Sequence, residues 1–188
     1  MNNQTLNTDK WSPWHYLNAD AAVPDEPGVY EIRTNFEFSR LRGSSSLVTI
    51  GSATASLRKR LCEQRFNNAV RYQNRAEKWL TQAGYTLEFR FTTVSGVEAR
   101  YLEALRLMEY ENKHWELPPG NEALPTTAIR RYIEQRHGRF TEKTLRDLLE
   151  HHGSPDKVAS VLGVSPAVVE NLVVYWGIIS PRNLAQKT

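Results

Sequence analysis

The sequence predicts an α+β protein made of two domains. Residues 1–124 are expected to form a small three-stranded sheet, mixed or antiparallel, with helices against it, and residues 125–188 an all-α domain with a helix-turn-helix. Two observations support this division. Alternating strand-type runs mix with helical stretches only before Asn121, and the chain after Leu124-Pro125 has helical periodicity alone.

The first two strands are expected to form a hairpin. The Pro27-Gly28 pair precedes an alternating run at residues 29–33, and residues 47–50 supply the second strand. Residues 34–46 are rich in polar side chains, with one glycine and several serines. This stretch is therefore predicted to be a long loop at the tip of the hairpin.

Two helices and a third strand follow the hairpin. Ser56 is suited to cap a helix that begins at Leu57. Residues 87–94 alternate apolar and polar side chains and predict the third strand, and the next helix runs from residue 95 or 96 toward His114. The order β-β-α-β-α places helices against one small sheet. Three aromatic residues near the N-terminus are expected to cover that sheet: Trp11, Trp14 and Tyr16.

The composition favours a cytoplasmic protein over exported or membrane classes. Cys62 is the single cysteine, which excludes an internal disulfide framework and a cysteine-rich zinc site. No apolar run approaches the roughly 18–20 residues that a membrane span requires. The chain carries 24 Lys and Arg against 21 Asp and Glu, a net charge of +3. This small excess is compatible with a polyanionic partner and does not establish one.

Five short motifs follow one another along the first domain. They are Gly28-Val29-Tyr30, Thr49-Ile50-Gly51-Ser52-Ala53, Leu57-Arg58-Lys59-Arg60-Leu61, Glu103 within a helix, and Pro119-Gly120-Asn121. In their order and spacing they resemble the GIY-YIG nuclease superfamily. The resemblance implies a DNA endonuclease that hydrolyses phosphodiester bonds with Mg²⁺ or Mn²⁺. Such hydrolysis requires an activated water, a cation near the non-bridging oxygens and help for the leaving alkoxide.

The resemblance assigns a role to each motif residue. Tyr30 would activate the attacking water, and a phenol, with a usual pKa of about 10, needs positive charge nearby for that task. Arg60 would grip the phosphate, with Arg58 as a competing assignment. Glu103 would bind the metal, with Glu109 as its rival. The supporting residues would be Asn121, Thr49 and Gln64.

Two of these positions depart from the family pattern. Thr49 stands where the second motif usually begins with tyrosine, and Gln64 stands where many members have a histidine. Threonine keeps a hydroxyl but has neither the reach nor the acidity of a phenol, and glutamine can orient water but cannot take a proton at neutral pH. The alternative hypothesis is therefore a catalytically impaired nucleic-acid-binding protein on a nuclease scaffold. The position of Glu103 is also open, because its helix face, shared with Ala99, Leu107 and Tyr110, is not obviously the core face.

A basic region beside the third motif suits the DNA backbone. Between residues 58 and 78, cations are interleaved with aromatic side chains, a composition that a solvated helix face can also have. The candidate DNA-binding residues in this region are Arg58, Lys59, Arg65, Arg71 and Arg75.

The second domain contains a pattern similar to helix-turn-helix modules. Ala159 is small where two helices would cross, Gly163 provides the turn, and Ser165-Pro166 would cap the second helix. That helix, residues 166–176, has no Lys or Arg. Asn171 could read adenine in DNA. A helix this apolar is equally suited to docking on a protein or forming a homodimer.

Overall fold

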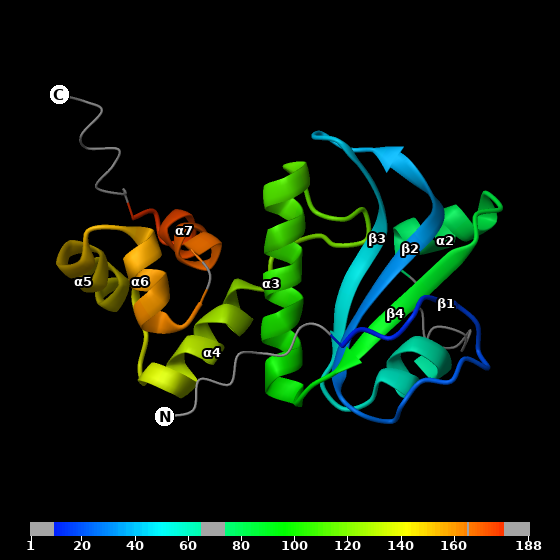
Figure 1. The fold of residues 1–188 in the computed structure, drawn as a ribbon, viewed down its shortest axis with the longest axis horizontal. Coiled ribbons are helices and arrows are strands. Elements are labelled where there is room, and N and C mark those ends of the chain that lie inside the picture. The colour runs from blue at the N-terminus through cyan, green and yellow to red at the C-terminus, as the bar shows by residue number, and fades with distance from the viewer. Residues whose placement is uncertain (1–9, 65–73, 165, 179–188) are drawn as a thin grey trace. The chain divides into compact units, whose positions relative to one another are not determined.

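The computed structural model describes residues 10–64, 74–164 and 166–178. The chain divides into two compact units, Met1–Leu124 and Pro125–Thr188. Among the described residues, the first unit combines a sheet with helices and the second contains helices only (Figure 1). The predicted α+β class is confirmed.

The first unit is built on one antiparallel sheet with the strand order β1-β4-β2-β3 (Figure 1). Its strands are β1 His15–Tyr16, β2 Gly28–Ser39, β3 Ser44–Ala53 and β4 Leu87–Thr93. The prediction of three strands is wrong, because His15 and Tyr16 pair with Phe89 and Glu88 of β4 and add a fourth strand at the edge. Two residues are too few to show the alternation from which a strand is predicted.

β2 and β3 form a longer hairpin than the sequence predicts. The expected loop at residues 34–46 is wrong, because β2 continues to Ser39 and β3 begins at Ser44. Register shifts on either side of Arg33 mark irregular pairing in the outer part of the hairpin. Phe36 stacks on Tyr85, with ring centroids 4.5 Å apart. This polar segment thus finds its packing partner far along the chain.

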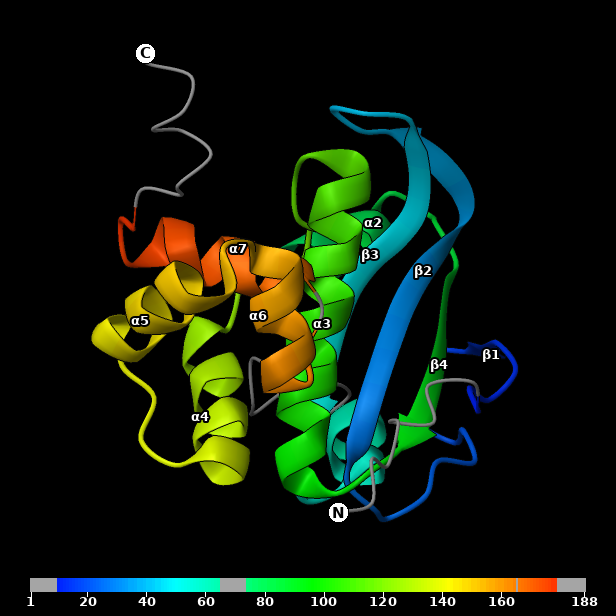
Figure 2. The same ribbon diagram turned by 60° about the vertical axis from the view of Figure 1, so that its left-hand side comes forward.

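The two faces of the sheet bury separate hydrophobic clusters. On one face α3, Gly96–His114, packs along β2 and β3 (Figure 2). The other face is covered by the short π-helical turn η1, Lys59–Glu63, together with α2, Arg75–Gln82. Successive side chains of a strand alternate between faces, so Val29 belongs to the α3 cluster and Tyr30 to the η1 cluster.

Local capping positions the helices of the first unit. Ser56 Oγ accepts a hydrogen bond of 3.0 Å from the backbone N–H of Lys59, as expected for a residue that caps this helical segment. Ser95 and Glu98 form a reciprocal capping box at the start of α3. At its other end α3 terminates at Trp115, which has a left-handed backbone with φ 61°. The helix therefore spans the length that the sequence predicts.

The N-terminal aromatic residues Trp11, Trp14 and Tyr16 cover part of the sheet, with one exception. The Arg90 guanidinium lies 4.7 Å from the ring centre of Trp11 and 4.8 Å from that of Trp14. The segment is attached by the backbone N–H of Ser12, which donates to Phe91 O at 2.8 Å. Tyr16 is 67% exposed, so the expectation that it covers the sheet is wrong.

The second unit consists of α4 Thr126–His137, α5 Glu142–His152, α6 Pro155–Leu162 and α7 Pro166–Tyr175. Gly163 ends α6 with φ 65°, which a residue with a side chain rarely adopts. Ala159 is buried, and its carbonyl accepts from the N–H of Val164. The expected cap at Ser165 lies outside the described residues. Among those described, no single helix has the length and apolarity to cross a membrane.

Candidate active site

Tyr30 of β2 lies across Gly51 of β3. The two residues are directly paired in the sheet, and Tyr30 is only 2% exposed. A Cβ atom at position 51 would lie 2.5 Å from both Cζ and Oη of the tyrosine. Real Cβ atoms essentially never approach another atom so closely. The glycine of the second motif is therefore required for the phenol of the first motif to lie where it does.

Arg60 reaches the phenol from η1. Its Nε donates a long hydrogen bond of 3.4 Å to Tyr30 Oη. Arg58, the competing assignment, is exposed at the start of the same turn. The geometry therefore favours Arg60 as the arginine of the site.

Glu103 of α3 faces the sheet. Its neighbours one turn away, Ala99 and Leu107, are buried in the cluster that packs on Val29 of β2. The helix face that the sequence left open is therefore the sheet-facing one. Ser52 Oγ donates to Glu103 Oε2 at 2.5 Å, which attaches the carboxylate to β3.

Glu109, the rival of Glu103, lies away from this arrangement. Its side chain is 62% exposed and forms an ion pair of 2.5 Å with Arg106. Arg106 also binds Glu31, a fully buried carboxylate, at 2.7 Å, and Arg90 binds the other oxygen of Glu31 at 2.6 Å. These pairs cross-link α3, β2 and β4, and sequence analysis did not find them because the partners lie 59 and 75 residues from Glu31.

Burial and nearby cations oppose each other at Glu103. Burial raises the pKa of this carboxyl group above its usual range, and it outweighs the Ser52 hydrogen bond and the positive charges of Arg60 and Arg100, which lower the pKa. Arg60 thus donates to the phenol of Tyr30, and its positive charge acts on the carboxylate of Glu103. The three side chains border the edge strand β3 from its two faces: Tyr30 and Arg60 lie on the η1 face, and Glu103 bonds Ser52 on the α3 face.

Asn121 is bound to the outer edge of β3. Its Oδ1 accepts from the N–H of Ile50 at 3.0 Å, and its Nδ2 donates to the carbonyl of Ile50 at 2.7 Å. The Asn121 amide thus forms hydrogen bonds with both the N–H and the carbonyl of Ile50, as a neighbouring strand would at this edge of the sheet. The preceding Gly120 donates to Val48 O at 2.7 Å. A Cβ on Gly120 would collide with Thr49 and with the Val48 carbonyl.

The two departures from the family pattern have different surroundings. Thr49 is buried, and its hydroxyl donates at 2.7 Å to Glu77 of α2, which is also buried. Its hydroxyl therefore joins β3 to α2. Gln64 directly follows η1 and is partly buried. Sequence analysis missed the role of Glu77 because an acidic residue in a basic helix resembles an ordinary surface position.

The chemistry of Glu103 suits a hard divalent cation. Mg²⁺ is commonly held by one or two carboxylates and keeps several waters, so a single glutamate can suffice. Burial disfavours the negative charge of this carboxylate, so a bound cation would stabilise its charged form. Among the described residues there is no cluster of three or more His, Cys, Asp or Glu side chains that could form an all-protein cage.

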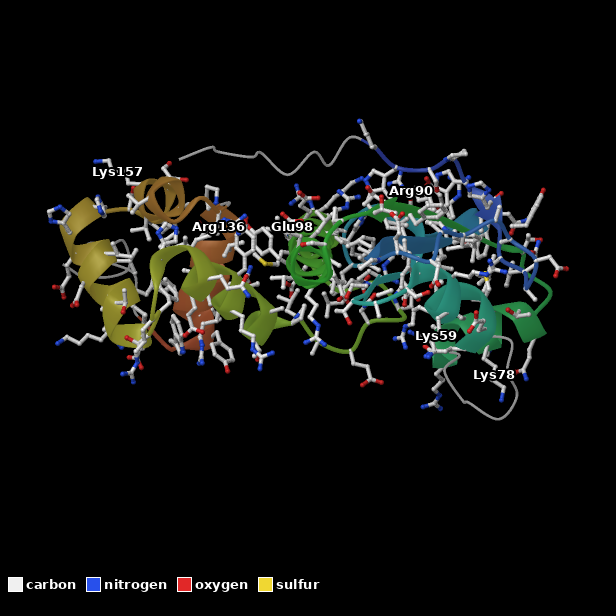
Figure 3. All side chains as sticks on the ribbon, turned by 90° about the horizontal axis from the view of Figure 1, so that it is seen from below. Lys59, Lys78, Arg90, Glu98, Arg136 and Lys157 are labelled. Carbon is white, nitrogen blue, oxygen red and sulfur yellow. The ribbon has the colours of Figure 1, made fainter. Side chains whose placement is uncertain are left out.

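Basic residues surround η1 and α2. Arg58, Lys59 and Arg75 are exposed, while Arg65 and Arg71 lie outside the described residues. Figure 3 shows Lys59 and Lys78 on one side of the first unit and Arg90 on the other. Trp79, next to Lys78 on α2, is 63% exposed. The η1 side therefore combines cations with an accessible aromatic ring.

Asn171 of α7 is partly buried. Its Nδ2 donates one hydrogen bond to the carbonyl of Ala167, one turn earlier in α7, at 2.9 Å. The amide NH2 has a second N–H, and Oδ1 can accept, so a contact with adenine stays a prediction. Near the end of α7, Val174 and Tyr175 are 79% and 61% exposed.

No family model, curated protein or solved structure matches the chain. Function must therefore be inferred from the geometry of these residues and from the motifs to which they belong.

Proposed function

We propose that the protein is a metal-dependent DNA endonuclease of the GIY-YIG type. The observation that carries this proposal is that Tyr30, Arg60 and Glu103 all border the edge strand β3: Arg60 bonds the phenol on one face, and Glu103 bonds Ser52 on the other. Two further contacts support it: Gly51 lies beneath the phenol, and Asn121 fixes the edge of β3 at Ile50. Each contact joins two of the five motifs, so the motifs form one structural unit.

Each side chain has a defined task in this proposal. Tyr30 would act as the phenolate, which takes the proton of the attacking water and becomes the neutral phenol; the Arg60 guanidinium, 3.4 Å from the phenol oxygen, would stabilise that phenolate and the negative charge that develops on the phosphate. Glu103, oriented by Ser52, would hold Mg²⁺ or Mn²⁺. The bound ion would neutralise charge on the non-bridging oxygens.

DNA is the proposed substrate because exposed cations border the site. Arg58, Lys59 and Arg75 can contact successive phosphates, and such contacts depend on salt. The second unit would add a further contact to DNA or a dimer surface. A cytoplasmic location belongs to the same proposal.

The test is cleavage of duplex DNA by the purified protein with Mg²⁺ or Mn²⁺. We expect Arg60→Ala and Glu103→Gln each to lower the single-turnover rate by roughly 10²-fold or more. Glu109→Gln is the matched control, because it removes a glutamate from the same helix at an exposed position. Cleavage that survives both site substitutions, or that falls equally in the control, would exclude this site.

A second candidate function is DNA binding without cleavage. It is favoured by the 2% exposure of Tyr30 and by the Thr49 hydroxyl, which is already bonded to Glu77. This candidate predicts salt-dependent DNA binding and no nicking with any divalent metal. Turnover that Glu103→Gln abolishes would reject it.

A further inference from the structure

A shallow pocket of about 350 Å³ lies at the far end of α3 from Ser95, beside the turn between β2 and β3. It is lined by Arg42, Gly43, Ser44, Lys113 and His114. All of these residues belong to the first unit. None of them belongs to the five motifs of the candidate active site.

Backbone contacts hold the two sides of this pocket together. The N–H of Arg42 donates to the carbonyl of His114 at 3.1 Å, and His114 Nδ1 lies 2.9 Å from the carbonyl of Arg42. Because a carbonyl can only accept, His114 must carry its proton on Nδ1. The N–H of Leu41 donates to Glu116 at 2.7 Å. The pocket is therefore preformed, and ligand binding need not order it.

The pocket carries positive charge from two separate elements. Arg42 and Lys113 are exposed, and neither has an acidic partner among the residues that the structure describes. Two acidic groups beside the pocket are engaged: Glu37 accepts from Ser44 Oγ at 2.5 Å, and Glu116 lies 3.0 Å from Arg40. Two unpaired cations beside a polar cleft suit an anionic ligand.

Trp115 adds an aromatic surface next to these cations. It is 66% exposed, and the Arg42 guanidinium lies 5.2 Å from its ring centre. Its φ of 61° is the left-handed conformation that glycine usually provides at the end of a helix. The ring therefore holds the Arg42 guanidinium at the surface by a cation–π contact, where the cation can meet a phosphate.

We propose that Arg42, Lys113 and Trp115 form a second DNA-backbone contact, remote from the cleavage centre. On α3, Lys113 follows Glu103 by ten residues, a helical distance of about 15 Å. Along duplex DNA this distance corresponds to roughly four to five base pairs. The position of the contact relative to the cut rests on the proposed nuclease function, whereas DNA binding by the patch does not.

Binding of the full chain to a duplex oligonucleotide, measured in EDTA over a series of salt concentrations, tests the proposal without cleavage. We expect Arg42→Gln/Lys113→Gln to reduce the slope of log affinity against log salt by roughly 1.8, because two phosphate contacts are lost. Lys10→Gln, an exposed cation before β1, is the control for loss of charge and should leave the slope nearly unchanged.

Trp115→Gly separates binding from folding. Glycine suits the left-handed conformation, so this variant should unfold at the same temperature as the wild type or higher. Its affinity for the duplex should nevertheless fall roughly two- to fivefold, because Arg42 loses the ring beside which its guanidinium lies. Unchanged affinity and slope in the Trp115 and double variants would overturn the proposal. So would variants that lose binding to poly(L-glutamate) but keep it to DNA, because the patch would then serve an acidic peptide.

Discussion

Replacing Gly51 with alanine tests whether the phenol of Tyr30 requires bare backbone beneath it. The added Cβ would lie 2.5 Å from Cζ and Oη of Tyr30, whereas non-bonded carbon atoms prefer about 3.5–4.0 Å. The ring must therefore retreat by about 1 Å. The distance from Arg60 Nε to Tyr30 Oη is already 3.4 Å. A shift of this size would break that hydrogen bond unless the arginine follows.

Two magnitudes follow from this collision. Overpacking a well-packed site costs about 1–3 kcal/mol of unfolding free energy. A displacement of about 1 Å in a reacting group can cost about 10²-fold in rate. We therefore expect Gly51→Ala to remain folded, to lose a modest part of its stability, and to cleave DNA about 100-fold more slowly. Denaturant unfolding and single-turnover cleavage with Mg²⁺ measure the two effects separately.

Gly84→Ala provides a control with a similar stability loss and no collision. Gly84 has a φ of +87°, and a Cβ there would meet nothing within 4 Å. The backbone strain should cost about 1–2 kcal/mol without moving Tyr30. If Gly51→Ala cleaves at the wild-type rate, or if both variants lose cleavage in proportion to stability, the phenol is not held as we infer.

Three further predictions concern the surrounding framework. Burial raises the pKa of Glu103, so the folded state binds the proton of this carboxyl group more tightly than the unfolded state does. The contribution of Glu103 to stability therefore falls as pH rises from the pKa of the unfolded state to that of the folded state. Glu103→Gln should equal or exceed the wild type in thermal stability at pH 7, and this advantage should shrink toward pH 4. Glu31→Gln should lower the unfolding free energy by about 3 kcal/mol, because it leaves two arginines without their buried carboxylate, and an unchanged denaturation midpoint would contradict this. Asn121→Asp keeps the acceptor for the Ile50 N–H but places a carboxylate against the Ile50 carbonyl. In the same unfolding assay it should therefore lower the unfolding free energy at least as much as Asn121→Ala, by about 1–3 kcal/mol.

Features that depend on a few neighbouring residues could be predicted from the sequence. Ser56 caps the helical segment before η1, and Ser95 with Glu98 caps α3, because these bonds join residues only three positions apart. The turn at Gly163 has the positive φ that its position implies. The long helix toward His114 ends where expected.

The sequence predicted which residues could form the site, from their types and their order along the chain, but not which of them meet. Spacing along the chain named Tyr30, Arg60 and Glu103, but it left Arg58 and Glu109 as rivals. The geometry favours one of each pair, because Arg60 contacts the phenol and Glu109 is turned outward toward Arg106. Which helix face meets the sheet depends on packing against β2 and β3, so α3 alone could not specify it.

By itself, the sequence determined where β2, β4 and α3 begin, that Ser56 caps the helical segment from Leu57, and which motif residues are available. Only the tertiary structure decided that β1 joins the sheet, that the hairpin continues past Arg33, that Thr49 bonds Glu77, and that Asn121 closes the edge of β3. The physical reason is distance along the chain. Caps and turns form between near neighbours, whereas the contacts of β1, Thr49 and Asn121, and the Phe36–Tyr85 stack that packs the hairpin, join residues between 28 and about 75 positions apart and exist only once the sheet has assembled.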